Sequence, residues 1–258
     1  MVDWCRFGAV LFDLDGVLTA TALLHARCWK ETFDPYLAGI VSGDEMASRP
    51  FDALDDYEKY VSGKPRHDGV TSFLASRGLC LPEGESTDSW DTETVCGFGN
   101  RKAELFSSVL LTGSVEAYPD AVALVRYLHE QSVRMAVVSS SRNCGPILDA
   151  TAIANCFELR VDGVVAERIG LAGKPAPDTF VHAAQELGVA PQETAVVEDA
   201  IAGVRAAKAG SFSLVVGINR TAGQVDLVAE GADVVVRDLR ETYRQIAGPM
   251  SSVSEINR

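Results

Sequence analysis

The sequence lacks a long apolar run. In its 258 residues no stretch approaches the roughly twenty consecutive apolar residues that a membrane-spanning helix requires. The short apolar segment near the N-terminus is interrupted by Asp13 and Asp15, a pattern that is not typical of a signal peptide. Internal repeats, low-complexity segments and coiled-coil heptads are also missing. We therefore expect a soluble, cytoplasmic protein that has no membrane partner and, without an assembly signal, is a monomer.

Positive charge is scarce as well. The chain has 23 Lys and Arg residues against 36 Asp and Glu residues, a formal net charge of −13 at pH 7. Nucleic acids and anionic membrane surfaces repel such an acidic chain, so nucleic acid is not an expected partner. An anionic small molecule can bind only where basic residues make the surface locally positive.

The six cysteines lack the spacings of metal-binding or redox motifs, and no Cys-x-x-Cys pair is present. We expect reduced thiols in a cytoplasmic protein, although the spacing alone leaves one disulfide open. The cysteines are Cys5, Cys28, Cys80, Cys96, Cys144 and Cys156.

The most informative stretch runs from Val10 to Thr19. Its apolar, strand-like segment ends on Asp13 and Asp15, and Gly16 follows. Residues i and i+2 of an extended chain point to the same side, so both carboxylates project from the strand end into one small space. Adjacent carboxylates repel each other and are costly to desolvate, which favours a role in cation binding or in chemistry. The alternative is a strand followed by an acidic turn, because Asp and Gly are common turn residues.

Three downstream segments carry polar groups of a complementary kind. The apolar strand at 135–138 ends at Ser139, and a later strand runs into Glu198 and Asp199. Between them, the sequence Gly-Lys-Pro-Ala-Pro-Asp places Lys174 in a rigid turn just before a helix. Because the strand ends of an open α/β sheet converge on one crevice, we expect these groups to meet the two aspartates of the first strand.

From residue 118 onward, helical patterns alternate with short Val-rich apolar runs. Such runs indicate parallel strands buried on both faces, and right-handed crossovers between them give a doubly wound, mainly parallel α/β sheet. The first strand, at 7–13, belongs to the same sheet. The strands predicted after it are 134–139, 194–198, 213–216 and 233–236, and the predicted helices are 121–131, 146–154, 179–187 and 200–209.

The section between the first strand and residue 116 is helical in pattern. An insertion that leaves the strand end bearing the aspartates lies directly over the predicted site, which is the position of a lid or cap. We predict a core domain of residues 1–20 and 116–248, an all-helical cap domain of residues 21–115, and a frayed tail at 249–258. The helices predicted in the cap are 23–33, 52–60, 69–76 and 101–111.

Asp13, Ser139, Lys174 and Asp199, in this order and setting, resemble the four motifs of the haloacid dehalogenase superfamily. The resemblance covers nearly the whole chain and implies a Rossmann-like core with an inserted cap. It also implies Mg²⁺-dependent phosphoryl transfer in which Asp13 is the nucleophile and forms an aspartyl phosphate. Asp15 then serves as general acid and base on the leaving and attacking oxygens.

The same resemblance implies a magnesium site. Asp13, the backbone carbonyl of Asp15, and Asp199 with Glu198 beside it would supply oxygen ligands. An alternative for Glu198 and Asp199 is capping of the next helix, and both interpretations can hold together. Lys174 would pair with the nucleophile and the phosphate. The core residues that would bind phosphate or sugar are Ser139, Ser141, Arg142 and Asn143.

The opening of the cap resembles that of β-phosphoglucomutases. In the segment 19–30, Thr21 and His25 occupy positions that belong to the cap hinge and the edge of the active site in that family. The resemblance implies that the histidine helps to control the proton state of Asp15. Without the match, a structural or solvated histidine is as good an interpretation of His25 as a catalytic one.

Two further cap segments carry the same resemblance. The segment 63–70 is similar to a loop whose arginine holds the distal phosphate of the substrate, which implies that role for Arg66. The segment 99–102 is similar to one whose lysine contacts the sugar, which implies Lys102, with Arg101 as the alternative register. The competing interpretation of both is plain surface charge.

Three features depart from the family pattern. Ala20 replaces an aspartate, Ser62 replaces a lysine of the cap loop, and the section 81–99 has no counterpart in compact members. These departures concern the substrate and the closure of the cap more than the chemistry.

The resemblance implies that the chain interconverts β-D-glucose 1-phosphate and glucose 6-phosphate through β-glucose 1,6-bisphosphate. A phosphatase that acts on a small sugar phosphate is the main alternative, because most members of the superfamily transfer the phosphoryl group to water. A non-catalytic sugar-phosphate sensor is the third possibility, although binding alone does not require a nucleophile.

Overall fold

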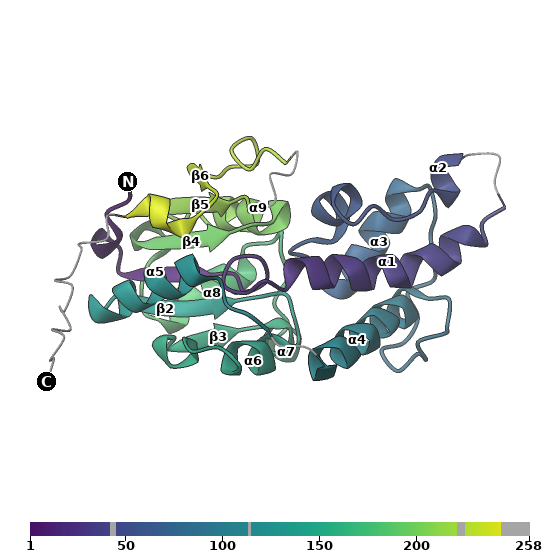
Figure 1. Cartoon of the computed structure of the whole chain (residues 1–258), viewed down its shortest axis with the longest axis horizontal. Coiled ribbons are helices and arrows are strands. Elements are labelled where there is room, and N and C mark those ends of the chain that lie inside the picture. The colour runs from purple at the N-terminus through teal and green to yellow at the C-terminus, as the bar shows by residue number, and fades with distance from the viewer. Residues whose placement is uncertain (42–44, 113–114, 221–224, 244–258) are drawn as a thin grey trace, which may run out of the picture.

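The structure is a computed structural model of the chain and describes residues 1–41, 45–112, 115–220 and 225–243. A sheet flanked by helices forms one body, and a group of helices forms a second body beside one end of it (Figure 1). The predicted tail at 249–258 lies outside the described residues. All six cysteines are free thiols. Within the described ranges, no helix has the length and apolarity needed to cross a membrane.

The sheet has six parallel strands in the order β3-β2-β1-β4-β5-β6. β1 is central, and its last residue, Phe12, is in register with Val137 of β2 and Val197 of β4. The residues that follow these three strands therefore emerge side by side at one edge of the sheet. This confirms the predicted doubly wound parallel sheet. The strands are β1 (Ala9–Phe12), β2 (Arg134–Val138), β3 (Leu159–Val161), β4 (Thr194–Glu198), β5 (Leu214–Ile218) and β6 (Val234–Val236).

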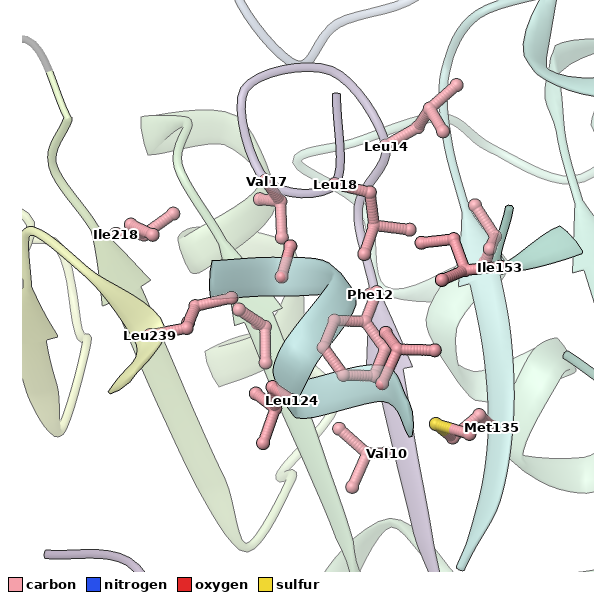
Figure 2. Packing of buried hydrophobic residues seen from close by; sticks show 14 of the residues in the cluster. Val10, Phe12, Leu14, Val17, Leu18, Leu124, Met135, Ile153, Ile218 and Leu239 are labelled. Atoms are coloured by element: carbon pink, nitrogen blue, oxygen red, sulfur yellow. The ribbon is translucent and has the colours of Figure 1, made fainter. Parts of the chain in front are cut away.

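Helices cover both faces of the sheet, which explains why its central strands are continuously apolar. On one face, Val10 and Phe12 pack with Leu124 of α5 (Pro119–Glu130), as Figure 2 shows. On the other face, Ala9 and Leu11 pack with a cluster that includes residues of α8 (Asp178–Glu186) and α9 (Ile201–Ala209). All four β1 side chains are fully buried. The strand that ends on Asp13 is therefore held rigidly from both sides.

The second body consists of helices from the segment between β1 and α5. Its members are α1 (Ala22–Ala38), α2 (Glu45–Ser48), the π-helix η2 (Tyr57–Val61), α3 (Arg66–Ser76) and α4 (Val95–Thr112). An aromatic cluster of its own fills the interior, where Phe33 lies 4.4 Å from Phe73 and 5.3 Å from Trp29 between ring centroids. These helices form the predicted cap.

Two chain segments connect the cap to the core. Thr19 forms isolated bridges with Asp15 and with Ala117, and the amide of Tyr118 donates to the carbonyl of Leu18 at 2.9 Å. The outgoing and returning segments therefore lie next to each other, directly after the two aspartates. This arrangement places the cap beside the carboxyl ends of the strands (Figure 1).

Some elements differ from the sequence prediction. β3 and α7 (Gly163–Ile169) were not predicted, and the helix expected at 146–154 is the shorter α6 (Cys144–Asp149). β3 has only three residues, and its middle residue, Arg160, is exposed, so its apolar signal is weak. The helix expected at 52–60 is shifted and forms the π-helix η2. The remaining short elements are the 3₁₀ turns η1 (Trp4–Arg6), η3 (Ala154–Cys156), η4 (Pro191–Glu193) and η5 (Leu239–Thr242).

Candidate active site

The side chain of Lys174 lies beneath the ends of the central strands and is almost completely buried. Its Nζ donates to Oδ1 of Asp13 and to Oε1 of Glu198, both at 2.6 Å, and to the carbonyl of Val138 at 3.0 Å. All three ammonium donors therefore have acceptors. Burial disfavours the charged lysine, but the two carboxylates outweigh it and raise the pKa of Lys174. The sequence prediction that Lys174 pairs with Asp13 agrees with this geometry.

Negative charge accumulates around Asp13. Burial, together with the carboxylates of Glu198 and Asp15, raises the pKa of Asp13 to about 8, although Lys174 opposes the shift. Burial and these neighbouring carboxylates also raise the pKa of Asp199 well above its usual range. A Cβ atom added to Gly16 would lie 1.9 Å from Oδ2 of Asp199, so this carboxylate touches the turn that carries the aspartate pair. One lysine does not neutralise this group of carboxylates.

The donor set fits a magnesium ion. Asp13 and Asp199 bring two carboxylates to the turn, and the backbone carbonyl of Asp15 is a third oxygen of the kind that Mg²⁺ prefers. Across the described ranges, no group of three or more His, Cys, Asp or Glu side chains is arranged to hold a metal. The set of two carboxylates and one carbonyl is compatible with that finding because it contains only two side chains.

Glu198 makes contacts that leave neither of its oxygens free. Oε1 accepts from Lys174, and Oε2 accepts from the backbone amides of Asp199 and Ala200 at 2.9 and 3.0 Å. A Cβ atom on Gly203 of α9 would lie only 1.7 Å from Oε1. These contacts occupy both oxygens and so disfavour direct ligation of a metal by Glu198; they hold the turn before α9 and orient Lys174 without bonding to the amides of the first turn of the helix.

Asp15 is connected to the cap by hydrogen bonds. Its Oδ1 accepts from Oγ1 of Thr21 at 2.5 Å and lies 3.2 Å from Nε2 of His25. Nδ1 of His25 lies 2.5 Å from Nζ of Lys102. The ammonium of Lys102 can only donate, so Nδ1 accepts and Nε2 carries the proton that points to Asp15. The chain of contacts therefore runs from Lys102 through neutral His25 to ionised Asp15.

The electrostatics of these three groups follow from burial and from one another. Burial opposes ionisation of Asp15, but His25, Thr21 and Lys102 lower its pKa to about 2. Burial and the Lys102 charge lower the pKa of His25, and burial lowers the pKa of Lys102 to about 8. The His25 ring stacks on Phe106 with centroids 4.0 Å apart. This packing holds the imidazole between α1 and α4.

The contacts decide between Lys102 and Arg101. Lys102 is buried, bonds to His25, and lies 5.5 Å from the ring centroid of Trp29. Arg101 instead lies over Trp90, 5.9 Å from its ring centroid. Lys102 is therefore the residue that faces the site.

The segment after β2 forms a turn of consecutive polar groups. Oγ of Ser139 accepts from the amide of Ser141 at 3.1 Å, and Oγ of Ser141 accepts from the amide of Asn143 at 3.2 Å. Ser139 Oγ also lies 3.5 Å from Oδ2 of Asp15. Arg142 pairs with Glu167 at the surface. The structure thus brings Ser139 to Asp15 and places the other predicted phosphate-binding residues directly behind it.

Arg66 lies at the start of α3 in the cap and is half-buried. Its Nη2 donates to Oδ1 of Asn100 at 3.0 Å, and its Nε donates to Nε2 of His67 at 3.3 Å. Among the described residues, no Asp or Glu forms an ion pair with Arg66. Burial and the charge of Arg142 lower its pKa. Arg66 therefore carries no carboxylate partner within the described residues, and the charge of the core residue Arg142 acts on it.

Sequence reasoning missed Arg220, which lies 204 residues from Gly16 in the chain. Its Nε and Nη2 donate to the carbonyls of Gly16 and Val17 at 2.9 and 3.0 Å, and Nη1 donates to Asp120 at 2.9 Å. The guanidinium also lies 3.7 Å from the ring centroid of Tyr118. Arg220 therefore fixes the turn that follows Asp15. No spacing in the sequence signals this contact.

Two other residues at the junction of cap and core were also missed. Oγ of Ser140 donates to the carbonyl of Gly63 at 2.7 Å, which ties the core to the cap loop. Tyr57 of η2 borders a cavity of about 250 Å³ that is also lined by Asp199. Burial and the charges of Asp199 and Asp15 raise the pKa of Tyr57 well above its usual value. A serine beside a motif and a tyrosine in a helix have many possible roles, so neither stands out in sequence.

The site consists of carboxylates paired with a buried lysine at the edge of a parallel sheet, and a helical cap lies beside it. This combination is typical of capped α/β enzymes of phosphoryl transfer. The chain belongs to the haloacid dehalogenase-like hydrolase family, whose model matches residues 7–210. It is 46% identical over 236 residues to β-phosphoglucomutase of Mycobacterium bovis, with 90% of each chain covered. It is 32% identical to β-phosphoglucomutase of Bacillus subtilis, over 92% of this chain and 96% of the relative.

A solved structure has the same fold. The β-phosphoglucomutase of Clostridium difficile superposes with a TM-score of 0.66 at 22% identity, over 92% of this chain and 93% of that chain. By its family and its 46% identity to mycobacterial β-phosphoglucomutases, the protein is a phosphoglucomutase-like enzyme. This confirms the predicted family and the predicted class of enzyme.

Proposed function

We propose that the protein is a Mg²⁺-dependent mutase that converts β-D-glucose 1-phosphate to glucose 6-phosphate through β-glucose 1,6-bisphosphate. The observation that carries the proposal is the chain of contacts from Asp15 through His25 to Lys102. It connects the acid/base candidate of the core to two residues of the cap, so that the protonation of Asp15 depends on the cap that encloses the sugar. The 46% identity to a β-phosphoglucomutase supports the same assignment.

In the first half of the reaction, phosphorylated Asp13 transfers its phosphoryl group to the C6 hydroxyl of β-glucose 1-phosphate. The bond between phosphorus and Asp13 breaks, and the bond between phosphorus and O6 forms. Asp15, which is ionised in the free enzyme, accepts the proton of the hydroxyl. The products of this half are free Asp13, protonated Asp15 and the bisphosphate.

In the second half, the bisphosphate binds with its C1 phosphate at Asp13. The carboxylate of Asp13 attacks that phosphorus, the bond to O1 breaks, and Asp15 returns its proton to O1. Glucose 6-phosphate leaves, and Asp13 is phosphorylated again. The proton and the phosphoryl group are therefore both conserved over one cycle.

Asp13, Asp199 and the carbonyl of Asp15 would hold Mg²⁺, which when bound neutralises negative charge on the transferring phosphoryl group. Lys174 holds one oxygen of Asp13 at 2.6 Å and so leaves the other oxygen to attack. Ser139, whose Oγ lies 3.5 Å from Oδ2 of Asp15, would contact the same phosphate. These residues position the reacting atoms in line.

The phosphate that does not react needs an anchor of its own. Arg66 presents a planar fork of donors without a carboxylate partner among the described residues, whereas Arg142 of the core pairs with Glu167 and would add a second positive charge. Ser141 and Asn143 lie on the same turn as Arg142. Together these residues would hold the distal phosphate in both orientations of the bisphosphate.

A mutase must also exclude water, because water competes with the sugar for the phosphoryl group. The loop at 63–65 fits closely against the core. A Cβ atom on Gly63 would lie 2.8 Å from Cβ of Ala200, and one on Gly173 would lie 2.1 Å from Cγ of Pro65. This close contact supports transfer to a sugar in preference to hydrolysis.

The test is an assay of two products. Purified enzyme with Mg²⁺ receives β-glucose 1-phosphate and a trace of glucose 1,6-bisphosphate, and glucose 6-phosphate and free phosphate are followed together. The proposal predicts glucose 6-phosphate with little phosphate. Phosphate release without glucose 6-phosphate would identify a phosphatase instead.

A further inference from the structure

The section of the cap before α4 is a closely hydrogen-bonded loop. We call residues 81–94 the insert loop. In this loop the carbonyls of Pro82 and Glu83 accept hydrogen bonds from the amides of Val95 and Cys96, the first two residues of α4, at 2.9 and 3.0 Å. The loop therefore satisfies donors that the start of a helix leaves unpaired.

Asp88 closes the insert loop from within. Its Oδ2 accepts from Oγ1 of Thr94 at 2.6 Å and from the amide of Glu85 at 3.1 Å. Gly84 adopts a left-handed conformation with φ of 77°, which favours glycine at this turn. These contacts fix the path of the loop and thereby the directions of its backbone carbonyls.

Asn100 joins the insert loop to Arg66. Its Nδ2 donates to the carbonyls of Ser86 and Asp88 at 3.1 and 2.9 Å, and its Oδ1 accepts from Nη2 of Arg66 at 3.0 Å. Both donors of the amide are used, so the amide cannot rotate without losing them. The loop therefore sets the position of the oxygen that holds Arg66.

Two glycines in the first turns of α4 make these contacts possible. A Cβ atom on Gly97 would lie 2.2 Å from the carbonyl oxygen of Thr92, and one on Gly99 would lie 2.5 Å from Cδ2 of His67. Glycine in a helix costs about 1 kcal/mol relative to alanine. Glycine at position 97 allows the insert loop to lie close to α4. Glycine at position 99 allows His67, the neighbour of Arg66, to do the same.

The charges explain why the connecting residue is an amide. The insert loop carries five acidic residues and no basic residue. A carboxylate bonded to Arg66 would neutralise the charge of the guanidinium and compete with an anionic ligand. Asn100 is neutral and connects the loop to Arg66 without this effect, and the side chain of Asp88 is bonded within the loop. Of the five N–H donors of Arg66, the two contacts with His67 and Asn100 use two, which leaves three for a ligand.

We propose that the insert loop and Asn100 are a positioning device that orients Arg66 toward the distal phosphate of a sugar bisphosphate. Asn100 is a positioning residue, because it acts through Arg66 and does not itself touch the substrate. This inference rests on the proposed role of Arg66 as the distal-phosphate anchor. It assigns a role in substrate binding to residues 81–94 of the cap.

The test measures binding in the Asp13→Asn background, where the proposed nucleophile is absent. Calorimetry with Mg²⁺ gives the Kd of β-glucose 1,6-bisphosphate and that of inorganic phosphate for four proteins: the background alone and the same protein with Asn100→Ala, Arg66→Ala or both. Ser76→Ala, which removes a partly buried hydrogen bond at the far end of α3, is the control.

We expect Asn100→Ala to weaken bisphosphate binding about tenfold, the value of one lost hydrogen bond to a charged group, with inorganic phosphate unchanged. In the presence of Arg66→Ala, the Asn100 substitution should cause no further loss, because its effect passes through Arg66. Asp88→Ala, which loosens the insert loop without touching Arg66, should weaken bisphosphate binding several-fold. Ser76→Ala should change neither Kd.

Three results would overturn the inference: unchanged bisphosphate binding in Asn100→Ala, an equal loss for both ligands, or a full additional loss in the double variant. If Arg66→Ala leaves bisphosphate binding unchanged, the distal anchor itself is wrong and the inference fails with it. Because binding requires no turnover, a failed mutase assay together with the predicted Kd pattern would overturn the proposed reaction and leave the positioning role supported.

Discussion

The ammonium of Lys174 lies 2.6 Å from Oδ1 of Asp13, although 161 residues separate them in the chain. The fold brings them together because Asp13 follows the central strand and Lys174 precedes α8, which packs on the same sheet. The same ammonium bonds to Glu198 at 2.6 Å. One buried cation therefore holds two carboxylates, and the further carboxylate of Asp199 gives the site a set of negative groups suited to a metal cation.

Asp13→Asn should abolish phosphoryl transfer. The amide is isosteric but is not a nucleophile, and we expect a loss on the order of 10⁴-fold or more. Turnover of an aryl phosphate measures the loss, and circular dichroism checks that the fold is retained. Substantial remaining turnover in a folded variant would rule out the covalent mechanism.

Glu198→Ala should destabilise the protein strongly. It removes a fully buried partner of Lys174 and the acceptor of two backbone amides, and breaking a buried pair costs roughly 3–5 kcal/mol. Denaturant unfolding gives the change in free energy. Glu230→Ala, which removes a more exposed pair with Arg205, is the matched control and should cost less than about 1 kcal/mol. Equal losses in the two variants would contradict this account of Glu198.

Asp15→Asn should separate the two halves of catalysis. The nucleophile is intact, so Asp13 should still be phosphorylated slowly by an activated donor such as acetyl phosphate. Mutase turnover should fall by about 10²–10⁴-fold, because no group accepts the proton of the sugar hydroxyl. Rapid-quench detection of the phosphorylated enzyme and a mutase assay give the two rates. Equal losses in both would remove the acid/base role.

His25→Ala should reduce mutase turnover about tenfold or more, since Asp15 loses the donor that holds its ionised form. The stability should change less than in Glu198→Ala, because the imidazole is neutral and contacts Asp15 and Lys102, whereas Glu198 is the charged partner of buried Lys174 and accepts from two backbone amides as well. Steady-state kinetics and thermal unfolding are measured on the same preparation. An unchanged mutase rate would show that His25 has a structural role and does not act on Asp15 during catalysis.

The pH profile should depend on Lys102. Burial lowers the pKa of Lys102 to about 8, so the residue loses its positive charge as the pH rises through that value. With saturating Mg²⁺, kcat/KM should fall above about pH 8. The free enzyme then lacks the positive charge of Lys102, which lies beside His25 and would face the anionic substrate. Lys102→Arg keeps the charge and should remove this alkaline decline, with a lower overall rate. A decline that persists in the variant would assign it to another group.

The sequence predicted the core of the site because strand ends of a parallel sheet meet at one edge. An apolar strand leads to each of Asp13, Ser139 and the pair Glu198–Asp199. The parallel topology alone is therefore enough to predict that these residues lie close together. Lys174 was predicted from its place in a rigid turn before a helix. The contacts of Glu198 were not predictable, because a strand end does not tell which way each carboxylate turns.

Two other contacts between distant segments could not be predicted. Arg220 reaches the turn after Asp15 from the end of β5, and Asn100 connects the insert loop to Arg66 through backbone carbonyls that have no sequence signature. β3 was missed because three residues with an exposed arginine carry little apolar signal. α7 did carry a signal, since Asp162 caps its start and Gly170 ends it in a left-handed conformation.

The most direct test of the central claim is the partition of the phosphorylated enzyme. The protein is phosphorylated with acetyl phosphate, freed of excess donor, and mixed with either β-glucose 1-phosphate or buffer, and the decay of the phosphorylated form is followed by rapid quench. The account predicts much faster decay with the sugar phosphate than with buffer, and recovery of the phosphoryl group as glucose 1,6-bisphosphate and glucose 6-phosphate. Equal decay in both mixtures, with all of the group released as free phosphate, would show that water is the acceptor and would contradict the mutase.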